Sequence, residues 1–343
     1  MSTNKARELL WPTDPKILLR FAFLYVGQGS SIIVLVRDSD SYKSILVDIN
    51  LDSKKGGVNV PELISDLLDG QKLGVFVNTH PHNDHLKGLI ELSEKVAIGE
   101  VWHSGHRPGK KHDDAYKDLE KVMKKVKDEG GDVIQLEGSR DEKSIGDARY
   151  YTLAPAEYVS EDIADEDQET RYHRIHEQCA VLKFGTGSTW VMLPGDADRD
   201  AFEKHITQYH KERLNAVLLA ASHHGSRTFF RYVEEDGPYL EARDAIDPEY
   251  VIMSAPRQEE SEHGHPHDDA VELYKESVGE QGVLHTGDNR YSFISDIRDD
   301  GSYSGIRDDK GELANLYRID GGDKTPVAPL IVGTRVDDRP MGS

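Results

Sequence analysis

His80-Pro81-His82-Asn83-Asp84-His85 is the stretch of sequence around which the rest of the chain is organised. The apolar, β-branched run at 73–78 comes directly before it and predicts a buried strand. Three histidines and one aspartate therefore follow the C-terminal end of a strand, where α/β folds usually carry their chemistry. Imidazole and carboxylate together suit zinc, manganese or iron. The alternative is a polar loop that happens to be rich in histidine, but the density of ligand-type residues favours a metal site.

Composition limits the classes of protein to which the chain can belong. Its 343 residues can form one large domain or two of ordinary size. A formal net charge of -21 opposes non-specific binding to nucleic acid and to anionic membranes, unless a local basic surface compensates. The single cysteine, Cys179, excludes an intrachain disulfide and favours a reducing compartment, so we expect a cytoplasmic protein. No apolar run is long enough to span a bilayer, and we expect no membrane association.

Further candidate ligands follow other predicted strands. The strand at 44–48 ends in Asp48, the strand at 189–193 precedes Asp196, and the strand at 216–222 precedes His223 and His224. A single acid at a strand end is commonly a helix cap or a turn residue. Four strand ends with such residues, one of them bearing the histidine cluster, indicate a shared cleft. The candidates outnumber the four positions of one tetrahedral zinc, which predicts a dinuclear site.

Six motifs, in the same order, give the chain a resemblance to a known family. Thr79–His85 resembles the THxHxDH signature of the metallo-β-lactamase-fold hydrolases. More narrowly, the chain resembles the hydrolase domain of the ComEC-type DNA-uptake proteins and their free-standing relatives. Residues 23–30 are similar to that group's FLDVGQGD element, and residues 45–48 to its acid-ended third strand. Residues 193–197 are similar to its TGDAE element, residues 223–227 to its HHGSR element and residues 264–267 to its GHPH element.

The resemblance covers about residues 20–298 and implies an α/β fold, a four-layer αβ/βα sandwich. In that architecture two mixed sheets pack face to face with helices outside. We expect an N-terminal lead-in at 1–19, the hydrolase domain at 20–298 and a polar C-terminal extension at 299–343. Tyr25 and Ser30 replace two acids of the first motif. His176-Glu177-Gln178-Cys179 stands where the group usually has Asn-Asn-x-Ser, so His176 is either an additional metal ligand or an exposed loop histidine.

The resemblance also implies a division of the ligands between two divalent ions, with Zn²⁺ expected and Mn²⁺ as the alternative. His80 and His82 would hold one ion, and Asp84 and His85 the other. Asp196 would bridge the two ions, and one of His223 and His224 would complete the second site. A hydroxide between the ions would be the nucleophile.

Three residues are candidates for catalytic roles besides ligation. Asp84 would also orient the nucleophile, and Asp48 would orient a ligand imidazole unless it is only a turn residue. His265, together with His267, would bind an anionic substrate or protonate a leaving group, although a surface loop explains both histidines nearly as well. A functional role is less favoured for His103 and His106.

Phosphodiester cleavage by a nuclease or nucleotide phosphodiesterase is the leading functional hypothesis, because two metal ions suit an in-line displacement at phosphorus. The acidic charge then favours a small nucleotide substrate, or a basic partner protein that presents nucleic acid. The second hypothesis is hydrolysis of a carbonyl substrate such as a lactone, thioester or β-lactam. The third is a metal-bearing regulatory subunit of a larger complex.

Overall fold

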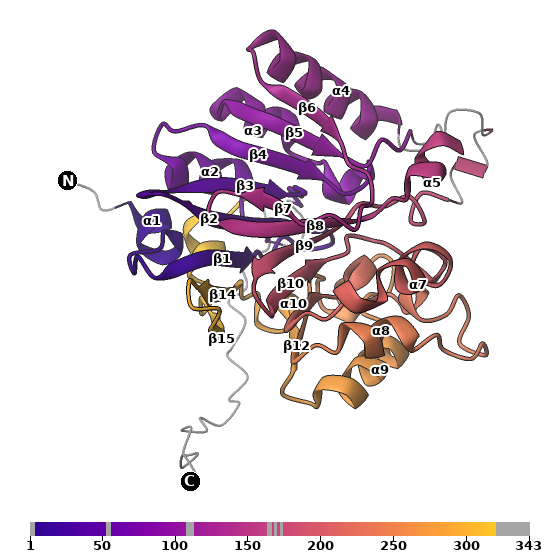
Figure 1. Ribbon diagram of the computed structural model, residues 1–343. Coiled ribbons are helices and arrows are strands. Elements are labelled where there is room, and N and C mark those ends of the chain that lie inside the picture. Colours follow the sequence, from indigo (N-terminus) through magenta and orange to yellow (C-terminus); the bar gives the residue numbers. More distant parts are fainter. Residues whose placement is uncertain are drawn as a thin grey trace, which may run out of the picture.

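The computed structural model describes residues 4–52, 56–107, 113–162, 167, 170–171 and 174–319. Two mixed β-sheets lie face to face, and helices cover the outer face of each sheet (Figure 1). In Figure 1 the helices α2, α3 and α4 lie on one outer side, and α7, α8 and α9 lie on the opposite side.

The first sheet has eight strands in the order β15-β14-β1-β2-β3-β4-β5-β6. Its antiparallel half runs from β15 to β3, and its parallel half runs from β3 to β6. The strands are β1 (Ile17–Phe23), β2 (Ile32–Asp38), β3 (Ser41–Val47), β4 (Leu73–Asn78), β5 (Ile98–His103), β6 (Asp132–Gln135), β14 (Phe293–Arg298) and β15 (Tyr303–Asp308).

The second sheet has seven strands in the order β13-β12-β11-β10-β9-β8-β7. Here β13 to β10 are parallel and β10 to β7 antiparallel, so both sheets combine a parallel half with an antiparallel half. The strands are β7 (Lys143–Ile145), β8 (Ala148–Ala154), β9 (Val181–Thr186), β10 (Thr189–Leu193), β11 (Leu218–Ala220), β12 (Tyr250–Met253) and β13 (Val283–His285).

The helices connect these strands. The α-helices are α1 (Lys5–Leu10), α2 (Val60–Leu68), α3 (Leu89–Lys95), α4 (Asp113–Asp128), α5 (Glu157–Asp162), α7 (Thr207–His210), α8 (Glu241–Ile246), α9 (Asp268–Val278), α10 (Thr286–Asn289) and α11 (Glu312–Leu316). A π-helical segment, η3 (Ala201–Ile206), precedes α7. Short 3₁₀ helices are η1 (Asn83–His85), η4 (Lys211–Arg213), η5 (Ser222–Gly225), η6 (Arg227–Phe229) and η7 (Gln258–Glu260). Among the described residues, no helix combines the length and the apolar character that a membrane span requires.

Three layers of buried apolar side chains separate the four layers of backbone. The first lies between the first sheet and α1 to α4, the second between the two sheets, and the third between the second sheet and its helices. Strand β2 shows how one strand serves two layers. Ile33 and Leu35 belong to the first layer, whereas Ile32 and Val34 belong to the second, because successive side chains of a strand point to opposite faces. This architecture confirms the expected four-layer sandwich.

The ends of the sandwich differ from the expected boundaries at residues 19 and 298. Ala6 and Leu10 of α1 are buried in the first apolar layer, together with Leu313 and Tyr317. Strand β15 pairs with β14 and extends the first sheet, which covers an edge of β14 that would otherwise be unpaired. The described parts of the expected lead-in and extension therefore pack as part of the sandwich, whereas residues 1–3 and 320–343 lie outside the described residues.

Candidate metal centre

The histidine cluster lies where both sheets present the C-terminal ends of their parallel strands. The loop after β4 and the short helix η1 carry the residues of the 80–85 stretch. Asp48 follows β3, Asp196 follows β10, and His224 lies in η5 directly after β11. His176 precedes β9. Strands from both sheets therefore deliver side chains to one site, as the strand-end pattern predicts.

The backbone around the site is held in conformations that only a packed surrounding can maintain. His223 and His224 are consecutive non-glycine residues in the left-handed region, with φ of 48° and 57°. Such residues each cost of order 1–3 kcal/mol and concentrate at functional sites. Gly195, with φ of 56°, lets the turn before Asp196 approach the next loop closely. A Cβ at this position would lie 2.7 Å from both Thr79 Oγ1 and Cys179 Sγ.

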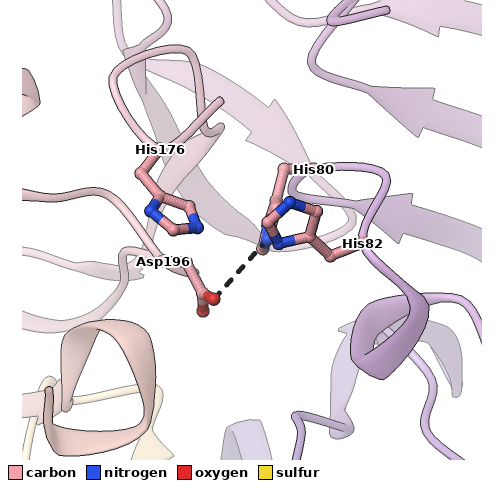
Figure 2. A group of neighbouring side chains, drawn as sticks. All are labelled: His80, His82, His176 and Asp196. Carbon is pink, nitrogen blue, oxygen red and sulfur yellow. Dashed lines mark ion pairs between the residues drawn. The ribbon is translucent and has the colours of Figure 1, made fainter. Parts of the chain in front are cut away.

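His80, His82, His176 and Asp196 form the first group of potential metal ligands, with one donor atom of each within 4.8 Å of the others. Figure 2 shows the three imidazoles and the carboxylate gathered around one point. His80 Nε2 lies 3.5 Å from Asp196 Oδ2, and the His82 and His176 ring centroids are 5.2 Å apart. The structure therefore places His176 beside the motif histidines rather than on an exposed loop.

Asp84, His85, Asp196 and His224 form the second group, with the same spacing of their donor atoms. His85 Nε2 lies 3.2 Å from Asp196 Oδ1, and His224 Nε2 lies 3.3 Å from Asp84 Oδ2. His223 belongs to neither group. Its Nδ1 is 3.0 Å from Thr228 Oγ1, and its Nε2 lies 3.6 Å from Asp196 Oδ2 at the rim of the site.

Asp48 lies behind the ligands and is buried. It accepts hydrogen bonds from the Thr79 backbone N–H at 2.8 Å and the Thr79 hydroxyl at 2.7 Å, and its Oδ2 lies 2.7 Å from His85 Nδ1. A carboxylate can only accept, so His85 carries a proton on Nδ1 and its Nε2 faces the second group. The Thr79 hydroxyl donates to Asp48, which leaves its oxygen to accept from His80 Nδ1 at 3.2 Å. Asp48 thus sets the orientation of one imidazole in each group.

The electrostatics of the site favour a bound cation. Burial opposes the charged forms of Asp84 and Asp196, but His85 and His224 outweigh that effect and lower the pKa of both carboxyls. Burial likewise opposes a charge on His85, yet the three surrounding aspartates raise its pKa. Protonated histidine therefore neutralises the carboxylates here, a role that a divalent ion can fill.

The donor atoms fit a metal for a second reason. His80 Nε2 and His176 Nε2 are buried and have no hydrogen-bond partner among the described residues. A buried ring nitrogen without a partner carries a desolvation cost of about 1–3 kcal/mol. Coordination to a metal would remove that cost. The residues present therefore fit divalent metal ions at both groups.

The remaining histidine candidates have different surroundings. His265 is buried next to His223 and belongs to neither ligand group; the two ring centroids are 5.1 Å apart. Burial and the neighbouring His224 and His267 lower the pKa of His265 to about 3. His267 Nδ1 accepts the backbone N–H of Arg227 at 3.0 Å.

His103 is partly buried and His106 is buried, and neither belongs to the two groups of potential ligands. His103 Nδ1 accepts the backbone N–H of Gly105 at 3.2 Å, and His106 Nδ1 is hydrogen-bonded to Gln178 Oε1.

Three residues of the site were not predicted from the sequence. Thr79 links Asp48 to His80, and Gln28 and Ser261 contact His265 and its loop. Thr79 is adjacent to the motif and Gln28 lies in the glycine-rich stretch at 27–30, so proximity to a motif was the available signal. Ser261 carries no such signal, because only the folded loop brings it to Gln28.

The two mixed sheets with helices outside, and the Thr79–His85 motif at their strand ends, agree with the fold expected from the resemblance to metallo-β-lactamase-fold hydrolases. Among solved structures, the chain is similar to a diphosphatase of the PhnP family, at 12% identity over 82% of this chain and 99% of that one, with a TM-score of 0.38. A β-lactamase from Chitinophaga pinensis aligns at 11% identity over 76% and 94%, with a TM-score of 0.33. The metallo-β-lactamase superfamily protein ST1585 from Sulfolobus tokodaii aligns at 17% identity over 51% and 62%, with a TM-score of 0.27.

No family model and no curated protein matches the chain. The narrower resemblance to ComEC-type hydrolases therefore stays a prediction from the sequence motifs.

Proposed function

We propose that the chain is a dinuclear metal-dependent hydrolase that cleaves phosphodiester bonds. The observation that carries this proposal is the shared carboxylate. Asp196 belongs to both ligand groups, with Oδ2 3.5 Å from His80 Nε2 and Oδ1 3.2 Å from His85 Nε2. A carboxylate that offers one oxygen to each of two imidazole groups suits a pair of adjacent ions, as in-line displacement at phosphorus uses.

The ligands divide between two positions. His80, His82 and His176 would hold one ion, Asp84, His85 and His224 would hold the other, and Asp196 would contact both. Two divalent ions bound there would bring the pKa of a water molecule near neutrality and polarise a phosphoryl oxygen. We expect Zn²⁺ from the predominance of imidazole, with Mn²⁺ as the alternative.

The other residues of the chain prepare the site for that chemistry. Asp48 holds His85, and through Thr79 also His80, in the tautomers that aim Nε2 at the ions. At the rim, the imidazoles of His223 and His265 can donate hydrogen bonds to phosphoryl oxygens. Asp84 has a partly exposed side chain, 30% by area, so solvent reaches this candidate ligand.

The charge of the chain bears on the size of the substrate. A net charge of -21 repels a long polyanion, which favours a nucleotide or a short oligonucleotide. The resemblance of the motifs to ComEC-type hydrolases supports nuclease-like activity on such substrates. A long nucleic acid would require a partner protein that supplies basic surface.

A screen of metal-reconstituted protein tests the proposal. The panel contains bis(p-nitrophenyl) phosphate, cyclic nucleotides, single-stranded DNA and RNA, together with a lactone, a thioester and a β-lactam. We expect turnover of at least one phosphodiester that is lost in chelated protein and in Asp196→Ala. Turnover confined to the carbonyl substrates would contradict the phosphodiester assignment, and no turnover of any class would contradict the assignment as a hydrolase.

A further inference from the structure

We propose that Gln28 is a positioning residue that holds neutral His265 in the tautomer with its proton on Nε2. The ring then serves as a hydrogen-bond donor at the rim of the metal centre. The tautomer follows from contacts within the chain, and the use of the donor by an anionic substrate rests on the proposed function.

A short series of hydrogen bonds joins Gln28 to His265. Gln28 Nε2 lies 3.4 Å from His265 Nδ1, and the Ser261 hydroxyl donates to Gln28 Oε1 at 2.8 Å. The same Ser261 oxygen accepts the backbone N–H of His265 at 3.0 Å and that of His263 at 3.3 Å.

The hydrogen-bonding capacity of the Ser261 hydroxyl decides which group donates in each hydrogen bond between Gln28 and His265. A hydroxyl has two acceptor lone pairs and one proton. Two backbone N–H groups occupy both lone pairs of Ser261, so its proton must go to the amide oxygen of Gln28. The other end of that amide is then an NH₂ group, which can only donate. His265 Nδ1 therefore accepts, and the proton of the neutral ring lies on Nε2.

The same count of the lone pairs and the proton of Ser261 disfavours the opposite orientation of the Gln28 amide. It would direct an N–H of Gln28 at Ser261, whose oxygen already accepts two backbone hydrogen bonds at 3.0 and 3.3 Å. It would also leave the Ser261 proton without its acceptor, Gln28 Oε1.

Gln28 is held in place on a loop that touches both the metal motif and the loop after β12. Ser30 donates its backbone N–H to the Asp84 carbonyl at 3.3 Å, and the Ser254 hydroxyl donates to the Gly29 carbonyl at 2.8 Å. Asn50 Nδ2 donates to the Gln28 carbonyl. Gly29 has φ of 136°, and a Cβ there would collide with the Asp84 carbonyl. These contacts therefore fix the backbone position from which the Gln28 side chain extends.

The location of His265 next to the candidate ligands allows this tautomer to donate a hydrogen bond there. The residue is only 5% exposed, and its ring centroid lies 5.1 Å from that of His223 and 6.3 Å from that of the ligand His224. A neutral ring with a proton on Nε2 can donate a hydrogen bond to an anionic oxygen as charge develops there. It acts without giving up its proton, which agrees with anion binding, one of the two roles expected from the sequence, and differs from the other, protonation of a leaving group.

Nitrogen-detected or nitrogen-correlated NMR of ¹⁵N-histidine-labelled, zinc-loaded protein reads the tautomer directly. His265 signals are assigned by their absence in His265→Ala. We expect the wild type to carry the proton on Nε2. Gln28→Glu replaces the donor with a group that can only accept, so we expect a proton on Nδ1 in that variant. A wild-type ring protonated on Nδ1, or an Nδ1 that stays unprotonated in Gln28→Glu, would overturn the proposal.

A double-mutant cycle tests whether Gln28 acts through His265. Loss of one hydrogen bond that selects the tautomer should lower kcat for a phosphodiester about threefold to tenfold in Gln28→Met, with KM little changed. The same substitution should have no further effect in a His265→Ala background. Gln208→Met is the matched control, because Gln208 is exposed on α7 and its side-chain amide donates to Glu241, away from the metal centre.

An equal loss from Gln28→Met in both backgrounds would contradict the positioning role. If no phosphodiester is turned over, the proposed function fails in the substrate screen, while NMR still decides the tautomer.

Discussion

Asp48 Oδ2 lies 2.7 Å from His85 Nδ1, and this hydrogen bond determines which nitrogen of His85 faces the candidate metal centre. The same carboxylate accepts the Thr79 hydroxyl, which in turn contacts His80 Nδ1 at 3.2 Å. Imidazoles of both ligand groups are thus oriented from one buried residue. Asp48 follows β3, and its φ of 56° turns the chain so that the carboxylate reaches the loop after β4.

Asp48→Asn should weaken metal binding at both groups. The amide cannot accept from His85 and Thr79 with the strength of a carboxylate, and loss of such an outer contact typically costs 10–100-fold in metal affinity. Competition titration against a chromophoric chelator measures this affinity. Asp69→Asn is the matched control, because Asp69 also has positive φ but is exposed at the end of α2. Unchanged affinity in a folded Asp48→Asn variant would contradict the orienting role.

Much of the fold could be predicted from the sequence because the central strands are buried on both faces. Such strands appear as continuous apolar runs, as at 73–78 and 189–193, and each ends close to a ligand-type residue. The edge strand β15 could not be predicted. Its residues are mostly polar and none of them is buried, so only its pairing with β14 defines it.

The site was predictable where its residues are close in sequence and not where tertiary contacts decide. His80 to His85 lie in one loop, so their spacing alone indicates a metal site. His176 belongs to a segment without a clear motif, and its role depends on the folded distance to His82. The choice between His223 and His224 depends on distances in the folded chain, because His224 Nε2 lies 3.3 Å from Asp84 Oδ2 whereas His223 belongs to neither group.

His176→Ala should reduce the affinity for one of the two ions at least tenfold, because the first group would lose one of its three imidazoles. Isothermal titration with Zn²⁺ should show one tight and one weakened site. His103→Ala is the comparison variant, since His103 contacts Gly105 and belongs to neither group. Two tight Zn²⁺ sites in His176→Ala would show that His176 is a loop histidine and not a metal ligand.

Lys183 gives a prediction for pH dependence away from the metal centre. Its ammonium group is buried over the Trp190 ring and donates to the Arg213 carbonyl, and burial lowers the pKa of Lys183 to about 8. In the unfolded chain the pKa of this lysine returns to its ordinary value of 10.5, so the unfolded chain binds more protons than the folded chain between these two values. The free energy of unfolding should therefore rise with pH across this window.

Comparison with Lys183→Met isolates that contribution, because the variant has no group that titrates there. Between pH 7 and 10 the stability of the wild type should rise relative to the variant by about 2 kcal/mol. Urea denaturation at several pH values measures the difference. A difference that does not change with pH would show that Lys183 titrates normally in the folded protein.

Asp84→Asn tests whether Asp84 is needed for turnover and metal binding rather than for folding. The substitution keeps the size of the side chain but removes the charge that faces His224 at 3.3 Å. We expect the phosphodiesterase rate to fall 10²–10⁴-fold, or about 3–5 kcal/mol of barrier, and metal content to fall toward one ion per chain. Circular dichroism should show an intact fold. Undiminished turnover in the folded variant would place the reaction elsewhere in the molecule.

The number of metal ions per chain tests the central claim most directly. Purified protein is saturated with Zn²⁺ or Mn²⁺, freed of unbound metal and analysed for its elemental content. Because Asp196 is common to both ligand groups, the wild type should approach two ions per chain, and Asp196→Ala should lose affinity at both positions. A wild-type stoichiometry fixed at zero or one under saturating metal would contradict the dinuclear site.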